Sequence, residues 1–99
     1  MNIQKMMKDL QRMQGKIQED IDALELEASS GGGVVVARMN GRKFLTAITL
    51  NPEAITPDDL GLMQDLILAA VNEASRKVDV EVQRMTEGIA GGLKIPGMS

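Results

Sequence analysis

The chain contains no cysteine, histidine, tryptophan or tyrosine, and Phe44 is its single aromatic residue. Without cysteine there are no disulfides and no thiolate chemistry, and without histidine the commonest metal ligand and general base are missing. Catalysis would have to rest on carboxylates and lysines, which form no recognisable catalytic or metal-binding pattern here. We therefore predict no enzyme activity, no cofactor, no metal and no small-molecule substrate.

Long apolar runs are also missing. No stretch of about 18 apolar residues occurs, and the N-terminus runs straight into an amphipathic pattern without the apolar segment of a signal peptide. We therefore expect a soluble cytoplasmic protein with no membrane partner. The 99 residues suit one domain, and a hydrophobic content of 43%, including eight methionines, is enough for a packed core.

The charge is unevenly distributed. The net charge of −3 argues against a general polyanion binder, because nucleic-acid-binding domains are usually basic. However, residues 1–16 contain four basic residues against Asp9 alone, whereas residues 17–30 contain five acids and no base. The chain is therefore locally dipolar, not uniformly acidic.

The first segment has the periodicity of an amphipathic helix. Apolar residues recur every three or four positions at Ile3, Met6, Leu10, Met13 and Ile17, and after an interruption at Asp20 the pattern resumes at Leu24. This spacing predicts a helix of about 24 residues, about 36 Å long. On the opposite face, within an arc of about 80°, lies a solvent-facing basic stripe. It consists of Lys5, Lys8, Arg12 and Lys16.

The middle of the chain predicts a sheet. Leu24 to Ser29 alternates as a short strand would, but the same letters suit a helix end, which we prefer. Glycines 31–33 then predict a tight reversal, and Asn40-Gly41 predicts a two-residue type I′ hairpin with arms Val34 to Met39 and Arg42 to Leu50. Together these segments predict a three-stranded antiparallel meander.

A second long helix follows. Thr56 suits its N-cap and Pro57 its first position, with Asp58 and Asp59 at the positive end of the macrodipole. Residues 60–71 are apolar on several sides, whereas residues 72–87 keep only a narrow apolar stripe. We predict one domain over residues 1–87. Residues 88–99 contain four glycines and a proline, so we expect a flexible tail there.

The two predicted helices create a packing problem. At about 36 and 45 Å, each is longer than the roughly 26 Å diameter of a compact domain of this size. One three-stranded sheet covers only part of their apolar stripes, so we predict an α+β protomer that buries the rest in a two-fold homodimer. The candidate core and interface residues are Leu60, Met63, Leu66, Ile67, Val71 and Ala74.

Positive charge collects at two places that could bind nucleic-acid phosphates. One is the basic stripe, although a merely solvated helix face is the commoner explanation for such a pattern. The other is the hairpin tip, where Arg38, Arg42 and Lys43 could touch phosphates or protect a sheet edge. The basic residues of the second helix alternate with acids, so pairing within that helix explains them better. They are Arg76, Lys77 and Arg84.

Seven short motifs occur in order along nearly the whole chain. They are Met6-Met7-Lys8 through Arg12-Met13-Gln14, Gly31-Gly32-Gly33, Asn40-Gly41, Ile48-Thr49-Leu50-Asn51-Pro52-Glu53, Pro57-Asp58-Asp59, Leu66-Ile67-Leu68-Ala69-Ala70-Val71-Asn72, and Gly91-Gly92-Leu93 with Pro96-Gly97. In this combination the chain resembles the YbaB/EbfC family of bacterial nucleoid-associated proteins.

This resemblance implies a homodimer of α-β-β-β-α protomers with projecting helices that binds double-stranded DNA with weak or variable sequence preference. With the basic stripe, it favours binding chiefly through phosphates, in the nucleoid, with effects on nucleoid organisation and gene expression. The alternative is an acidic, methionine-rich protein-interaction adaptor that does not bind DNA directly.

Overall fold

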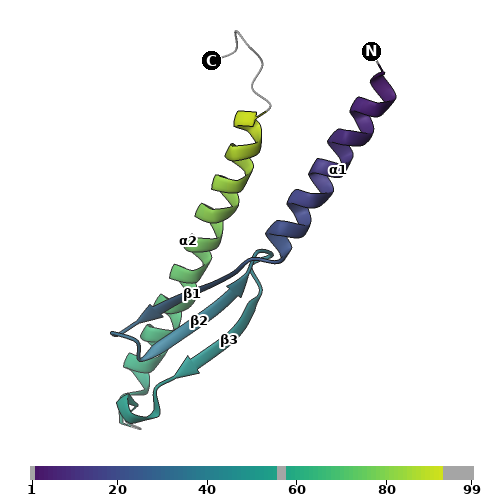
Figure 1. Cartoon of the computed structure of the whole chain (residues 1–99). Helices are drawn as coiled ribbons and strands as arrows, with labels where there is room; N and C mark the ends of the chain where they lie inside the picture. Colours follow the sequence, from purple (N-terminus) through teal and green to yellow (C-terminus); the bar gives the residue numbers. More distant parts are fainter. Residues whose placement is uncertain (1, 56–57, 93–99) are drawn as a thin grey trace.

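A computed structural model of the chain describes residues 2–55 and 58–92. Its elements are α1 (Ile3–Asp22), β1 (Glu25–Ser30), β2 (Val35–Asn40), β3 (Leu45–Leu50), a short 3-10 helix η1 (Pro52–Ala54) and α2 (Leu60–Gly92). The strands form one antiparallel sheet in the order β1-β2-β3. The predicted α+β class, with a meander between two long helices, is confirmed (Figure 1).

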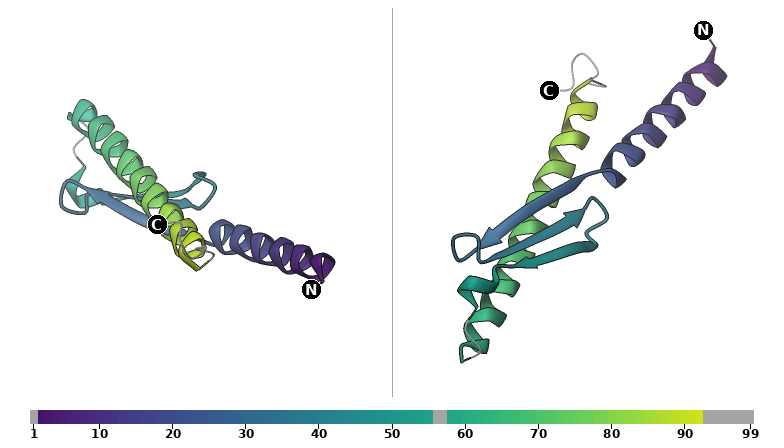
Figure 2. Two further views of the ribbon diagram at one scale, coloured as in Figure 1. Left: turned by 90° about the horizontal axis from the view of Figure 1, so that it is seen from above. Right: turned by 60° about the horizontal axis from the view of Figure 1, so that its bottom comes forward.

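The two helices play different parts in this architecture. Helix α2 passes behind the sheet and packs on β1 and β2, whereas α1 projects from the sheet and has no buried residue (Figures 1 and 2). Both helices point toward the same end of the molecule, which measures 70 × 26 × 15 Å along its principal axes. Neither helix, over the residues described, is long and apolar enough to cross a membrane.

The core lies between α2 and the two strands beneath it. Side chains alternate across a strand, so every second residue of β2 faces the helix. Alanines on both layers let the helix approach the sheet closely. The buried residues are Ala28, Val35, Ala37, Met39, Ala70, Ala74 and Val78.

The turn between β1 and β2 is the tight reversal that the glycines predicted. Gly31, Gly32 and Gly33 have φ values of 62°, 71° and 100°, a region that other residues occupy only with strain. The hydroxyl of Ser30 donates a hydrogen bond of 2.5 Å to the backbone carbonyl of Leu66. This bond joins the end of β1 to α2.

The first helix is shorter than predicted. It ends at Asp22, and Glu25–Ser30 is the strand β1, so our preference for a helix end over these residues was wrong. The reason is tertiary: each residue of β1 pairs with β2, from Glu25 opposite Asn40 to Ser30 opposite Val35. The period-two alternation places Leu26 and Ala28 toward α2, which a helix could not do.

The β2–β3 hairpin also differs from the prediction. The N–H of Lys43 donates to the carbonyl of Asn40 at 3.0 Å, and the positive φ of 67° is at Lys43 instead of at Asn40 and Gly41. The side-chain oxygen of Asn40 accepts from the N–H groups of Arg42 and Phe44, at 2.9 and 3.1 Å. Because this side chain satisfies the turn amides, the loop is longer than two residues and β3 begins only at Leu45.

Helix α2 extends further than predicted at its C-terminal end. The predicted cap residues Thr56 and Pro57 lie outside the described residues, and the carbonyl of Asp59 accepts the N–H of Met63 at 3.1 Å. The helix runs to Gly92, past its predicted end near residue 87. Residues 88–92 therefore extend the helix instead of starting a tail, and residues 93–99 lie outside the described part.

Two glycines offer a matched test of the fold. An added Cβ at Gly41 would overlap the backbone carbonyl oxygen of Ile21, whereas one at Gly15 would meet nothing within 4 Å. We expect Gly41→Ala to destabilise the protein by about 1–3 kcal/mol, because backbone must move. Gly15→Ala should stabilise α1 by about 0.5–1 kcal/mol, because glycine is costly inside a helix. Thermal unfolding followed by circular dichroism measures both changes. If the two substitutions changed the free energy of unfolding in the same direction, this account would be wrong.

Candidate nucleic-acid interface

The basic stripe lies along the projecting helix. Lys5, Lys8, Arg12 and Lys16 are all exposed, and none of them forms an ion pair with any other residue in the described ranges. The sequence correctly placed them on a solvent face. Their charge is therefore available to a ligand along one edge of a helix about 30 Å long.

The cations of the sheet are in a different situation, because acids of the same chain neutralise them. Arg38 pairs with Glu27 across β1 and β2. Arg42 pairs with Asp22 of α1 at 3.2 Å, and Lys43 pairs with Asp79 of α2 at 3.0 Å. The three candidate DNA contacts of the hairpin thus form bonds inside the protomer, which the sequence alone did not indicate.

Shifts in pKa agree with this pairing. The pKa of Asp22 lies below its ordinary value chiefly because the carboxylate accepts a hydrogen bond from Gln18; desolvation opposes this effect, and the hydrogen bond and charge of Arg42 add to it. A hydrogen bond to Glu27 raises the pKa of Arg38. Since folding lowers the pKa of Asp22, its contribution to stability is complete above the ordinary carboxylate range and is lost as the pH falls through the lowered value.

The cations of α2 fit the predicted pairing with one exception. Arg76 pairs with Glu73 and Arg84 with Glu81, each three residues away, as predicted. Lys77 has no acidic partner in the described part of the chain. Its Nζ donates instead to the backbone carbonyl of Glu27 at 2.8 Å, at the outer edge of the sheet. Because that partner is 50 positions away in the sequence, no local pattern could have revealed it.

The candidate core and interface residues of α2 divide by burial. Ala74 is fully buried in the protomer, and four others are partly buried against the core: Met63, Leu66, Ile67 and Val71. Leu60 is 64% exposed. Leu66 lies against Gly31 at the end of β1, so the opposite side of α2 is turned toward β3. We call this side the apolar flank, consisting of Leu60, Ile67, Leu68 and Val71.

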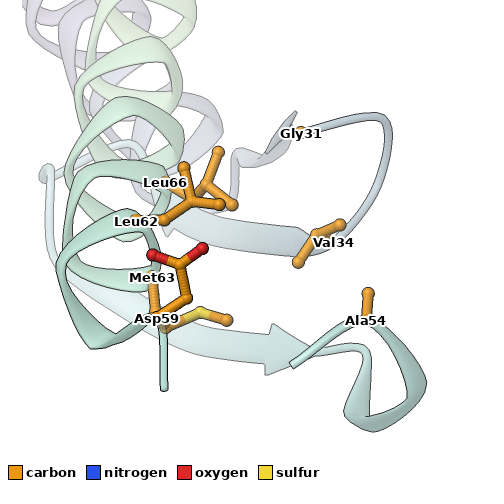
Figure 3. A pocket seen from close by; sticks show the side chains of 7 residues that line it. All are labelled: Gly31, Val34, Ala54, Asp59, Leu62, Met63 and Leu66. Atoms are coloured by element: carbon orange, nitrogen blue, oxygen red, sulfur yellow. The ribbon is translucent and has the colours of Figure 1, made fainter. Parts of the chain in front are cut away.

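A small hollow lies between the start of α2 and the β1–β2 turn (Figure 3). Its volume is about 240 Å³, below the usual range for small-molecule sites, and Asp59 is the single charged residue that lines it. One carboxylate among apolar side chains offers neither a paired acid and base nor a ligand set. No group of three metal-ligating side chains occurs among residues 2–55 and 58–92.

Comparison with known proteins assigns the chain to a family. Residues 1–93 match the model of the YbaB/EbfC DNA-binding family. A nucleoid-associated protein of Clostridium novyi is 42% identical over 101 residues, which cover 99% of this chain and 89% of the relative. Another, of Acetivibrio thermocellus, is 46% identical over 101 residues, which cover 98% of this chain and 89% of the relative.

A solved structure shares the fold. The crystal structure of an uncharacterized protein from Helicobacter pylori superposes with a TM-score of 0.74 at 17% identity, covering 91% of this chain and 98% of the other. At this identity the likeness concerns the fold alone. The family match and the full-length relatives establish the assignment that the seven motifs indicated, to DNA-binding proteins and not to enzymes. The chain belongs to the YbaB/EbfC DNA-binding family.

Proposed function

We propose that the chain binds double-stranded DNA as a homodimer, chiefly through phosphate contacts made by the basic stripe of α1. It acts in the bacterial cytoplasm and affects nucleoid organisation and gene expression. The observation that carries this proposal is the division among the cations. Those of α1 have no acidic partner in the described residues, whereas all three of the hairpin are paired. The nucleoid-associated relatives support the location.

The proposal also explains how an acidic chain can bind a polyanion. Four acids of the sheet and α2 are paired with hairpin and helix cations, namely Glu27, Glu73, Asp79 and Glu81. Helix α1, which carries the basic stripe, projects away from the sheet (Figure 1). Electrostatic attraction is screened within about 10 Å at ordinary salt, so the local charge of residues 1–16, with four bases against Asp9, matters more than the net charge of −3.

The homodimer is supported by apolar surface that one protomer leaves uncovered. Helix α2 packs on β1 and β2, while Leu45 and Leu50 of β3 remain 44% and 37% exposed. The apolar flank extends this surface on α2, where Leu68 is 61% exposed. A contiguous apolar face of this kind marks a contact site. A two-fold contact with a second copy would cover this face on both protomers at once.

One observation favours the adaptor as a second candidate. The apolar stripe of α1 is also exposed, with Ile3, Met6, Met7, Leu10 and Met13 between 43% and 68% accessible. Methionine-rich helix faces adapt to many protein partners. The two functions differ in their response to salt, because phosphate binding weakens steeply as counterions are added and an apolar contact does not.

We expect DNA affinity to fall with salt as a phosphate binder requires. If about six of the eight basic-stripe cations of a dimer lie on phosphates, the slope of log K against log salt is about −5. Changing all four stripe residues to Gln should flatten this slope and weaken binding to all DNA sequences alike, because phosphate contacts carry no base information. Gel-shift titrations at several salt concentrations measure both effects.

A control variant removes the same number of charges from paired positions. Arg38, Arg76 and Arg84 each pair with an acid in the protomer, and Lys77 binds a backbone carbonyl, so replacing these four by Gln leaves the basic stripe intact. This variant should keep most of the slope of log K against log salt. Equal losses in both variants would show that net charge and not the stripe governs binding, and no binding by the parent chain at low salt would favour the adaptor.

We expect the apolar flank to hold the dimer together. Leu68 on the flank and Leu62 on the other side of α2 are 61% and 52% exposed, so a protomer can accept a charge at either position. Leu68→Glu should give a folded monomer at micromolar concentration, because a charge buried unpaired at the contact costs several kcal/mol. Leu62→Glu should remain dimeric. Sedimentation measures both, and a parent chain that is a stable monomer would disprove the dimer.

A further inference from the structure

We propose that the tip of the β2–β3 hairpin is the joint that sets the direction of α1, with Gly41 and Arg42 as positioning residues and Lys43 as the anchor to α2. Any effect of this joint on DNA affinity rests on the proposed function, whereas the joint itself does not depend on it. This assigns to the hairpin cations a role different from the phosphate contacts that the sequence suggested.

The tip meets the last turn of α1 in two ways. Gly41 lies so close to the backbone carbonyl of Ile21 that no other residue fits, and Arg42 Nε donates to Oδ1 of Asp22 at 3.2 Å. The N–H of Leu24 also donates to that Ile21 carbonyl, at 3.1 Å. The end of α1 is therefore held by a backbone contact and by an ion pair next to each other.

The sequence of α1 explains why it needs this contact. Its last turn contains no basic residue, and it carries Glu19, Asp20 and Asp22 at the negative end of the helix macrodipole. Acids at this end are unfavourable, and a cation there is favourable. Arg42 supplies that cation from a different element, so the dipole of α1 and the charge of Asp22 both favour docking on the hairpin.

The neighbouring residue extends the joint to the other helix. Lys43 has the positive φ of 67°, and its Nζ lies 3.0 Å from Asp79 of α2. Consecutive cations of one turn therefore bind one acid on each helix. No residue of α1 is buried, and its direct contact with α2 is small compared with the packing of α2 on the sheet, so the joint is the specific contact that holds the end of α1.

A small change at this joint has a large effect at the far end of α1. A rotation of about 10° at Asp22 moves the other end of a helix about 30 Å long by about 5 Å. This is more than the rise of about 3.4 Å between successive phosphates of one DNA strand. The register of the basic stripe therefore depends on the joint, although the joint residues need not touch DNA.

The direction of α1 can be measured in the full chain without DNA. The chain has no cysteine, so Gln11→Cys on α1 and Gln83→Cys on α2, both exposed, accept spin labels at two sites only. Refolding with a large excess of unlabelled chain removes distances between protomers. Double electron–electron resonance then gives the distribution of distances between the two helices.

We expect a narrow distribution in the parent, and a broader one in Arg42→Gln, in Asp22→Asn and in the parent at high salt, which screens the pair. The charge swap, Arg42→Asp with Asp22→Arg, should narrow the distance distribution again, because it restores the ion pair. If the single substitutions broadened the distribution only by disturbing the local structure, the swap would not narrow it. Amide exchange at Ala23 and Leu24 should accelerate by up to about fivefold in either single variant, the size expected for one exposed ion pair. Arg76→Gln, which breaks a pair inside α2, should change neither quantity.

Distributions in Arg42→Gln and Asp22→Asn that match the parent would overturn the joint, as would a swap that stays broad. Failure of the parent chain to bind DNA would overturn the proposed function and leave these distances unaffected. The two proposals are therefore tested separately.

Discussion

The close packing of α2 on β1 and β2 is the contact on which the rest of the molecule depends. Ala70 and Ala74 of the helix meet Val35 and Ala37 of the sheet, and these residues are fully buried. An α-helix is about 10 Å wide and neighbouring strands lie about 4.8 Å apart, so one helix covers about two strands. The third strand, β3, then lies beside the helix, and its Leu45 and Leu50 remain accessible.

The same contact leaves α1 outside the core. Once α2 occupies the covered face, α1 has no place on it, and it projects from the start of β1 (Figure 2). Its helical form comes from local periodicity, its N-cap at Asn2 and the contacts at its last turn. A helix placed in this way can present a ligand-binding face along its whole length, at the cost of an apolar stripe that one protomer cannot bury.

The sequence predicted those parts of the structure whose causes are local. Periodicity placed the two helices, and the glycines at 31–33 placed a turn with three positive φ values. The errors arose where distant residues decide the outcome. Leu24 to Ser29 allowed helix or strand, and only pairing with β2 selects the strand. At the hairpin, the Asn40 side chain binds turn amides and moves the positive φ to Lys43.

The candidate site shows the same division between local and distant causes. The sequence placed the basic stripe on a solvent face because helix periodicity is sufficient for that inference. It grouped Arg38, Arg42 and Lys43 with the stripe because their acidic partners are 11, 20 and 36 positions away. Only the folded chain brings Glu27, Asp22 and Asp79 to these cations.

Charge segregation along the chain thus serves two purposes. The acids that follow the basic stripe in sequence include Asp22, which binds the hairpin tip and ties α1 to the sheet. The bases that precede them have no such partner in the described structure and remain available to phosphates. If basic and acidic residues alternated along α1, pairs within the helix would satisfy both, as they do at Arg76 and Arg84 of α2. Keeping the two kinds of charge apart leaves α1 one face for a polyanion and one end for its own hairpin.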